Sequence, residues 1–223
     1  MTRETDDRLD EQLEKVTRLK GLKFAHLNCL SLLRNFDELC TIQERLSIDF
    51  LTLSETHIDD LIDDSELKID GYDIVRKDRN RRGGGVAAYI RSNLKYNIRT
   101  DIMSDELELI AIELKVSHRK PIVVLVWYRP PNANVDVFQQ FERVIQSIDD
   151  HESDLLILGD LNCDVASYTR SWQTKHLFDI IESYNMEQII NSPTRVTPRT
   201  SSTIDVIITN RPEKITNSGV IPI

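Results

Sequence analysis

Short apolar runs that stop at a polar side chain recur along this sequence, and they restrict the folds that it can adopt. Runs of four or five apolar residues are typical of strands. In layered α/β folds, ligands collect outside the carboxyl ends of strands. If four runs enter their sheets in one sense and the fifth in the other, their polar groups meet at one edge. These groups are Asn28, Glu55, Tyr128 and Asp160, each at the end of a run, and Asp205, at the start of the fifth.

The remaining periodicity predicts an α/β protein with about twice as many strands as helices. Neighbouring strands in the middle of the chain are spaced like hairpins, which argues against a single doubly wound parallel sheet. Two mixed sheets packed face to face, with helices outside, accommodate this order better. Helices are expected at about 33–46, 135–148 and 172–182, and strands from 22 and at 50–54, 72–76, 86–90, 107–116, 122–128, 155–158 and 204–209.

The length of 223 residues fits one domain. Residues 1–20 are dominated by charge and are interpreted as an appendage, frayed or helical, so the domain is expected at 21–223. No stretch approaches the apolar length of a membrane span. The three cysteines lack metal-ligand spacing and indicate reduced thiols in an intracellular protein, nuclear or cytoplasmic.

The formal net charge of −9 argues against broad, non-specific binding to polyanions. It leaves a nucleic-acid substrate open, because acidic site residues raise the count and a local basic strip can contact phosphates. The strip in this sequence consists of Arg76, Lys77, Arg79, Arg81 and Arg82. An ordinary solvated loop is the alternative interpretation.

Asp160 stands in the sharpest local motif, Gly-Asp-Leu-Asn-Cys-Asp at 159–164. The spacing resembles the start of a calcium loop, but Val165 and Ser171 stand where that loop needs Gly and Glu. An Asp at a buried strand end, with Asn162 two residues later, suits a base paired with an orienting amide; a structural turn is the alternative. Glu55 occupies the same relative place on another run. Oxygen ligands of this kind suit a hard divalent cation and hydrolytic chemistry.

Several common catalytic motifs are absent from the sequence. The glycines at 83–85 lack the Gly-Lys-Ser/Thr ending of a phosphate loop, and a tight turn or a close backbone approach explains them better. Neither Gly-x-Ser-x-Gly nor His-Glu-x-x-His occurs, which lowers serine-hydrolase and zinc-protease interpretations. His57 is close enough in sequence to Glu55 to touch a site there, but a single loop histidine is more often passive.

Five short motifs occur in a fixed order: Leu27-Asn28, Ser54-Glu55-Thr56, Trp127-Tyr128-Arg129-Pro130-Pro131, Gly159-Asp160-Leu161-Asn162 and Thr203-Ile204-Asp205. In this order they resemble the endonuclease/exonuclease/phosphatase superfamily, from about residue 22 onward. The sequence is most similar to the endonuclease domain of non-long-terminal-repeat retrotransposons, which is itself similar to abasic-site endonucleases. The resemblance implies a four-layer α/β/β/α sandwich and hydrolysis of phosphodiester bonds in DNA with Mg²⁺, or with Mn²⁺ as an alternative.

The same resemblance implies a role for each site residue. Glu55 would be the principal metal ligand, with Asn28 beside it. Asp160 would activate or position the attacking water, and Asn162 would orient that water or the phosphate. Tyr128 would donate a hydrogen bond to the phosphate.

The sequence departs from the family at the histidine that Asp205 would orient. The family ends its catalytic set with an Asp-His pair on a later strand, whereas no histidine follows His176 here. We therefore expect a fold that lacks its C-terminal strand, leaves one sheet edge unpaired, and has weak or undetectable nuclease activity. The alternatives are a non-catalytic fragment that binds metal or nucleic acid, and a phosphatase for another phosphate ester. A reverse transcriptase domain is the expected partner in a longer parent protein.

Overall fold

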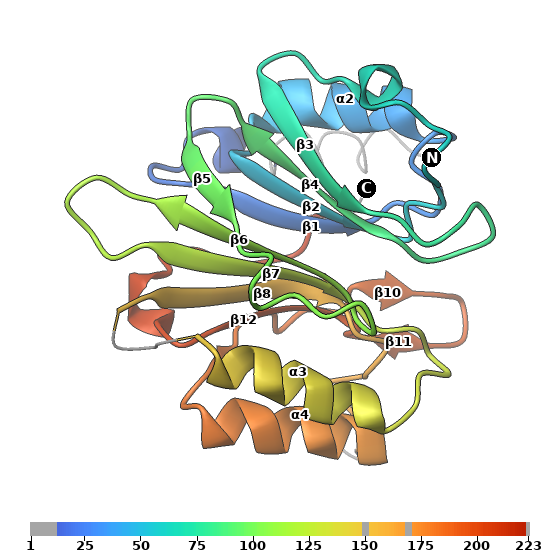
Figure 1. Cartoon of the computed structure of the whole chain (residues 1–223), viewed down its shortest axis with the longest axis vertical. Coiled ribbons are helices and arrows are strands. Elements are labelled where there is room, and N and C mark those ends of the chain that lie inside the picture. The colour runs from blue at the N-terminus through green and yellow to red at the C-terminus, as the bar shows by residue number, and fades with distance from the viewer. Residues whose placement is uncertain (1–12, 149–151, 168–170, 222–223) are drawn as a thin grey trace.

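The computed structural model describes residues 13–148, 152–167 and 171–221. Two mixed sheets pack face to face, and helices cover their outer faces (Figure 1). Helix α2 (Phe36–Leu46) covers the first sheet, and helices α3 (Asp136–Gln146) and α4 (Trp172–Ser183) cover the second. The α/β/β/α order of layers confirms the expected fold class.

The first sheet has four strands in the order β1-β2-β4-β3, with β1 at one edge. Strands β1 and β2 are parallel and end side by side, so that Asn28 is aligned with Ser54. Strand β4 is antiparallel to both of its neighbours. The strands are β1 (Phe24–Asn28), β2 (Phe50–Ser54), β3 (Tyr72–Lys77) and β4 (Val86–Arg91).

The second sheet has six strands in the order β5-β6-β7-β8-β12-β9. Strands β7 and β8 are parallel, and β12 is antiparallel to β8 with Asp205 opposite Asp160. Within the sheets, β1 runs parallel to β2 and β7 parallel to β8, whereas β12 runs in the opposite direction to β8. These are the directions that the polar ends of the five apolar runs predict. The strands are β5 (Lys95–Ile98), β6 (Glu108–Lys115), β7 (Ile122–Tyr128), β8 (Asp154–Asp160), β9 (Glu187–Gln188) and β12 (Asp205–Thr209).

The structure differs from the sequence-based expectation mainly in its shortest elements. Strand β5 is largely exposed and β9 has two residues, so neither has a recognisable apolar pattern. The segment at 191–203, expected as a loop, contains the small hairpin of β10 (Arg195–Val196) and β11 (Ser201–Ser202). Two 3₁₀ helices, η1 (Asp64–Leu67) and η2 (Pro212–Lys214), were also not expected.

Helix α2 begins three residues later than its apolar pattern predicts, because Asn35, directly before it, has a non-helical backbone with φ −109° and ψ 18°. Upstream of it, Leu30 and Ser31 have positive φ values of 45° and 97° in the loop that follows β1. The loop is held by backbone hydrogen bonds from Ser31 to Glu55 and from Leu32 to Thr56. It therefore ties the end of β1 to the residues that follow β2.

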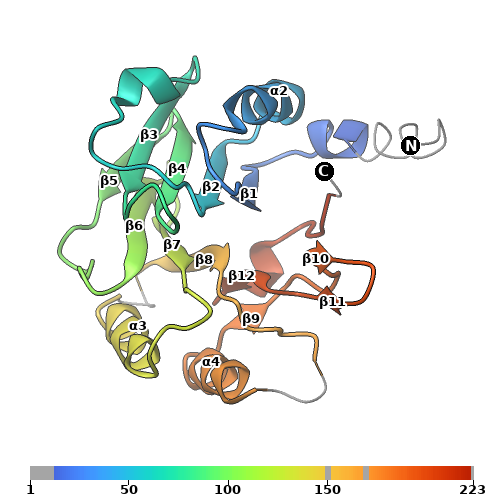
Figure 2. The same ribbon diagram turned by 90° about the vertical axis from the view of Figure 1, so that its right-hand side faces the viewer.

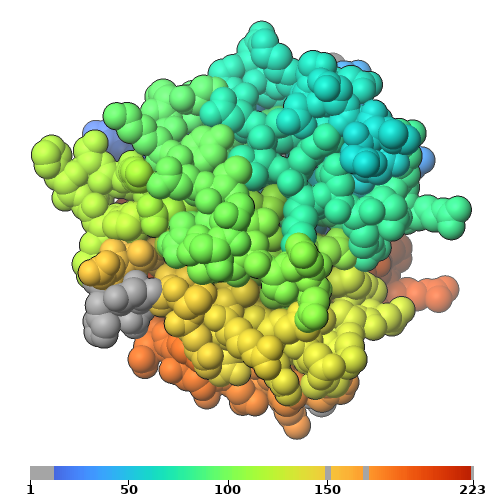
Figure 3. Space-filling view, in the orientation of Figure 1, coloured from blue at the N-terminus to red at the C-terminus, as the bar shows by residue number. Residues whose placement is uncertain are grey.

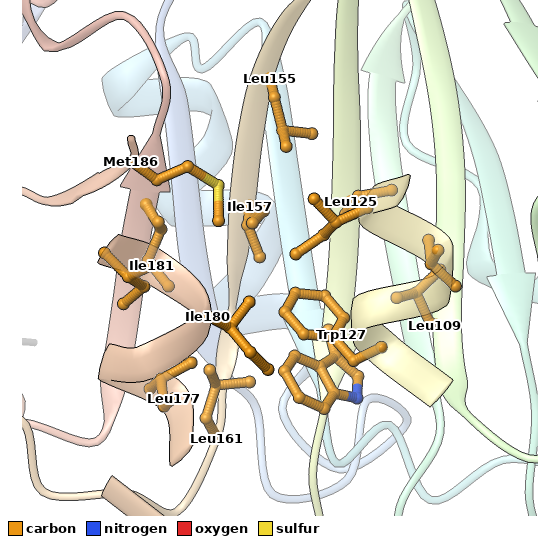
Figure 4. Packing of buried hydrophobic residues seen from close by; sticks show 14 of the residues in the cluster. Leu109, Leu125, Trp127, Leu155, Ile157, Leu161, Leu177, Ile180, Ile181 and Met186 are labelled. Atoms are coloured by element: carbon orange, nitrogen blue, oxygen red, sulfur yellow. The ribbon is translucent and has the colours of Figure 1, made fainter. Parts of the chain in front are cut away.

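Three apolar clusters stabilise the layers, one between the sheets and one under each helical layer. Trp127 of β7 stacks on Phe141 of α3 with ring centroids 3.8 Å apart. Ile157 on β8 faces Leu177 and Ile180 of α4 in the same cluster (Figure 4). In the space-filling view the halves of the molecule that carry the two sheets are in continuous contact (Figure 3).

The N-terminal stretch enters the structure only in part. Residues 13–17 are helical, and Leu13 is buried against the cluster under α2. Residues 1–12, on which most of the expected appendage falls, lie outside the described residues. No helix among the described residues is long and apolar enough to cross a membrane.

Candidate active site

Four polar side chains meet where strands of the two sheets end. Strands β1 and β7 end at Asn28 and Tyr128, β8 ends at Asp160, and Glu55 directly follows β2. Figure 2 looks onto this edge of the molecule. The pairing of parallel strands within each sheet places the residues at one rim, as the apolar runs predict.

The side-chain amide of Asn28 joins the two sheets at this rim. Its Nδ2 donates to Glu55 Oε1 at 3.0 Å and to Asp160 Oδ2 at 2.8 Å. The hydroxyl of Tyr128 donates to the same Glu55 Oε1 at 3.3 Å. Asn28 Oδ1 accepts from the backbone N–H of Leu30 at 3.2 Å, which fixes the amide orientation. Four residues that are far apart in sequence thus form one hydrogen-bonded set.

The oxygen atoms of this set fit a magnesium-type cation. No group of three His, Cys, Asp or Glu side chains in the described part of the chain could hold a metal ion by itself. Mg²⁺ does not need such a group, because it binds one or two carboxylates and keeps several water ligands. Glu55 and Asp160 supply two carboxylates that lie within hydrogen-bond distance of one amide nitrogen.

Burial determines the protonation of Asp160, which is 1% exposed. Removal from water, together with the charge of Asp205 on the adjacent strand, raises its pKa to about 6. The hydrogen bonds from Asn28 and from the backbone N–H of Asn162 oppose this rise. A carboxyl with such a pKa is ionised at neutral pH and is basic enough to accept a proton from water.

The raised pKa predicts that metal-free Asp160 destabilises the fold as the pH rises. In the unfolded chain the carboxyl ionises near pH 3.8, whereas in the folded protein it does so near 6. The folded state therefore holds the extra proton between these values, and stability falls across this window by about 3 kcal/mol. Urea unfolding from pH 4 to 7 should show Asp160→Asn gaining stability relative to the parent by that amount. A constant difference between the two proteins would contradict the assignment.

Asn162 contacts the site through the turn that follows β8. Its backbone N–H donates to Asp160 Oδ1 at 2.9 Å, and its side-chain Nδ2 donates to the carbonyl of Arg129 at 3.0 Å. The residue has a left-handed φ of 49°. In this geometry the amide nitrogen is engaged with β7, so the expected contact with water or phosphate uses the amide oxygen.

Asp205 faces His26, a histidine to which the sequence pattern assigned no role. The Nε2 atom of His26 lies 3.7 Å from Asp205 Oδ1, and this oxygen has no hydrogen-bond partner in the part of the chain that the structure describes. His26 Nδ1 lies 2.8 Å from Thr52 Oγ1. Burial lowers the pKa of His26 to about 4, and the Asp205 charge only partly offsets this. Strand alternation could have revealed the residue, because His26 lies two positions before Asn28 and on the same face of β1.

His57 is the second histidine at the site. Its Nε2 lies 3.4 Å from Glu55 Oε2, so the contact that the sequence left open is present. Both residues have positive φ values, 52° and 53°, in the loop after β2. Gly85 packs against this loop so closely that a Cβ on it would lie 2.4 Å from Thr56 Oγ1. The expected close approach of the glycine segment therefore occurs beside the site.

The basic strip is largely occupied by partners within the chain. Arg76 pairs with Asp64 at 2.8 Å, Arg79 with Glu108 at 2.7 Å and Arg81 with Asp59 at 2.9 Å. Lys77 donates to the carbonyl of Ser104 at 2.6 Å, and Arg82 is exposed. The strip therefore presents less free positive charge than its sequence suggests, and its contact with nucleic acid stays a prediction.

Comparisons with known proteins agree with the observed fold. Residues 25–223 match the Endonuclease/Exonuclease/phosphatase family. No curated protein matches the sequence. The endonuclease domain of TRAS1, a telomere-specific non-LTR retrotransposon, has a similar structure with a TM-score of 0.69 at 13% identity, over 85% of this chain and 84% of that one.

Two further solved structures share the fold. The AP endonuclease LMAP from Leishmania major is 14% identical with a TM-score of 0.67, over 94% of this chain and 90% of that one. The 3'-5' exonuclease NExo from Neisseria meningitidis is 15% identical with a TM-score of 0.65, over 84% and 86%. At these identities the likeness concerns the fold alone.

Proposed function

Because the chain belongs to the Endonuclease/Exonuclease/phosphatase family, we propose that it is built for cation-dependent hydrolysis of phosphodiester bonds in DNA. The observation that carries this proposal is the Asn28 amide that joins Glu55 and Asp160 across the two sheets. Two carboxylates that share one donor repel each other, and a divalent cation would relieve that repulsion. The similar structures named as nucleases favour DNA as the substrate.

Glu55 and Asn28 would hold the cation, Mg²⁺ or Mn²⁺, at the ends of β1 and β2. A cation bound there would neutralise the negative charge that develops on the phosphate and on the leaving oxygen. Coordination by Asn28 would use Oδ1, which now accepts from Leu30. The negative charge of Glu55 is the main attraction for the cation at this rim.

The remaining residues would act on water and phosphate. Asp160 takes the proton of the attacking water, a contribution of about 10²–10⁴-fold. Asn162 orients that water or the phosphate from the same turn. Burial, reinforced by the charges of Glu55 and Asp160, raises the pKa of Tyr128, so its hydroxyl stays protonated and donates to a phosphate oxygen. Asp205 orients a histidine.

The histidine that faces Asp205 in this structure cannot touch a substrate. The side chain of His26 is 3% exposed and lies between the sheets. We therefore expect the 223-residue chain to have weak or undetectable nuclease activity. Loss of one preorganised donor to the charge that develops on the phosphate lowers the rate by about 10²–10³-fold. Catalytic groups act together, so the lack of a histidine that reaches the substrate also weakens the contribution of the other groups.

A Mg²⁺ titration combined with a plasmid-nicking assay tests this proposal. The 223-residue chain should bind the cation but nick slowly or not at all, whereas a longer form with a further strand bearing Asp-His should nick readily. Robust nicking of plasmid or abasic-site DNA by the 223-residue chain would contradict the expected loss. Absence of both Mg²⁺ binding and nicking in the longer form would contradict the function itself.

Two alternatives make different predictions in the same experiment. A non-catalytic domain that binds metal or nucleic acid would bind the cation or DNA and never nick, even with the added strand. A phosphatase for another phosphate ester would release phosphate from a substrate panel without nicking DNA; one similar structure is named as the 3' phosphatase NExo from Neisseria. A neighbouring reverse transcriptase domain stays a prediction about a longer protein.

Arg82 offers a test of DNA contact by the basic strip. Replacement by Gln should weaken binding about equally at every DNA sequence and flatten the dependence of log K on log salt by about one. Arg143 is also exposed but lies on α3, on the outer face of the second sheet, and Arg143→Gln is the matched control. An unchanged salt slope for Arg82→Gln would support the interpretation as a solvated loop.

A further inference from the structure

Arg129 is a fully buried arginine directly after Tyr128, and none of the roles described above uses its side chain. The residue is 1% exposed, although it follows the last residue of β7 at the rim of the site. Its Cζ lies 5.2 Å from the ring centroid of Phe138 on α3. Arginine is rarely buried to this extent without a paired acid.

Arg129 hydrogen-bonds to three consecutive residues of the turn that carries the proposed base. Its backbone N–H donates to the carbonyl of Asp160 at 3.0 Å. Its guanidinium Nη1 donates to the carbonyl of Leu161 at 3.2 Å, and its own carbonyl accepts from Asn162 Nδ2 at 3.0 Å. Main chain and side chain of one residue thus hold the whole turn against β7.

This turn needs such support because its backbone is constrained on both sides. Asn162 has a left-handed φ of 49°, which a residue with a side chain adopts only when its surroundings hold it there. Before the turn, β8 approaches β7 so closely that a Cβ on Gly159 would lie 1.8 Å from the carbonyl oxygen of Trp127. The position of the Asp160 carboxyl therefore depends on how firmly the turn is held.

The guanidinium is also incompletely satisfied. Nε and Nη2 of Arg129 are buried and have no hydrogen-bond partner among the described residues. A buried charge without an acid costs stability, and an apolar side chain of similar size often serves a purely structural position as well or better. An arginine at this position is therefore better explained by its orienting the turn at 160–162 than by a contribution to the stability of the fold.

We infer that Arg129 is a positioning residue, which acts through the turn at 160–162 to set the Asp160 carboxyl against Asn28 and Glu55. The inference rests on the proposed function for its catalytic consequence, but the geometric part stands by itself. Helix α3 takes part, because the guanidinium packs over the ring of Phe138. The outer helical layer is thereby connected to the site.

The test compares Arg129→Met and Arg129→Lys in the complete chain, by amide hydrogen exchange, Mg²⁺ titration and urea unfolding. Arg129→Met should speed exchange of the Leu161 and Asn162 amide protons by about tenfold and weaken Mg²⁺ binding severalfold, with little change in the urea midpoint. Arg129→Lys keeps a donor within reach of the Leu161 carbonyl. It should therefore restore part of the protection from exchange and part of the Mg²⁺ affinity. In a form that nicks DNA, kcat should fall about tenfold in Arg129→Met while KM is unchanged.

Arg91 provides a matched control at the opposite end of the first sheet. Its backbone N–H and its guanidinium bind Asp49 and Ser47 much as Arg129 binds the turn at 160–162. Arg91→Met should lower the urea midpoint without changing exchange at Asn162 or Mg²⁺ affinity.

Two results would overturn the inference. One is parental exchange at Asn162 and parental Mg²⁺ affinity in Arg129→Met. The other is equal losses in the Met and Lys variants that follow a lowered urea midpoint, as a purely structural role predicts. Absence of nicking in every form would count against the proposed function, while the exchange data would still decide the role of Arg129.

Discussion

Asp160→Ala is expected to abolish detectable nicking in any form of the protein that cleaves DNA. The carboxylate is the proposed proton acceptor, and loss of such a group costs about 10²–10⁴-fold in rate. The substitution also leaves the Asn28 amide with one acceptor instead of two, because Nδ2 then contacts only Glu55. Single-turnover nicking at saturating Mg²⁺ measures the chemical step directly.

Asp154 is a control for this substitution on the same strand. It lies at the beginning of β8, at the opposite end from Asp160, where it pairs with Lys214 at 2.6 Å. Asp154→Ala should affect stability modestly and leave the nicking rate close to that of the parent. If Asp160→Ala retains activity within about tenfold of the parent, Asp160 is not the base.

Glu55→Ala is expected to weaken Mg²⁺ binding and to lower the nicking rate strongly. The side chain is 21% exposed at the rim, so its charge is accessible to a cation and only partly screened by water. Without it, one carboxylate remains, and Asn28 and Tyr128 each lose an acceptor. Calorimetric titration should show Mg²⁺ affinity lowered by at least about tenfold, and nicking should fall by about 10²–10³-fold.

Glu113 is a close match for Glu55 in its exposure. It is also 21% exposed and lies near a basic side chain, Arg99 at 3.4 Å, but on β6 it is aligned with Val123 near the start of β7, away from the rim where β7 ends. Glu113→Ala should therefore leave both Mg²⁺ affinity and nicking unchanged. Equal Mg²⁺ affinity in the parent and in Glu55→Ala would place the cation elsewhere.

The long elements of the fold were predictable because their patterns are strong. Buried strands such as β7 and β8 are continuous apolar runs, and α3 has an apolar face at helical spacing. The short strands β5 and β9 were not predictable, because they depend on pairing with a neighbour and not on burial of their own side chains. The late start of α2 reflects the non-helical backbone of Asn35, whose side chain donates to the carbonyl of Cys29, a contact that no local pattern records.

The candidate site was predictable in its members and less so in its connections. Alternation on β1 contained enough information to find His26, but not to show that it would face Asp205 across the gap between the sheets. The basic strip shows the opposite error, since closely spaced arginines suggest free charge while the fold pairs Arg79 and Arg81 with acids 29 and 22 positions away.

The sequence by itself determined which segments form the layers and which polar residue stands at the end of each long strand. Burial requires apolar runs, and a polar side chain is tolerated where a strand leaves the core. Tertiary structure decided how those ends combine. Only sheet packing brings Asn28 within 2.8 Å of Asp160, 132 positions later, and only the packed structure supplies the burial and the neighbouring charge of Asp205 that raise the pKa of that carboxyl. Distances across two sheets and removal from water are properties of the packed chain, and no local stretch of sequence contains them.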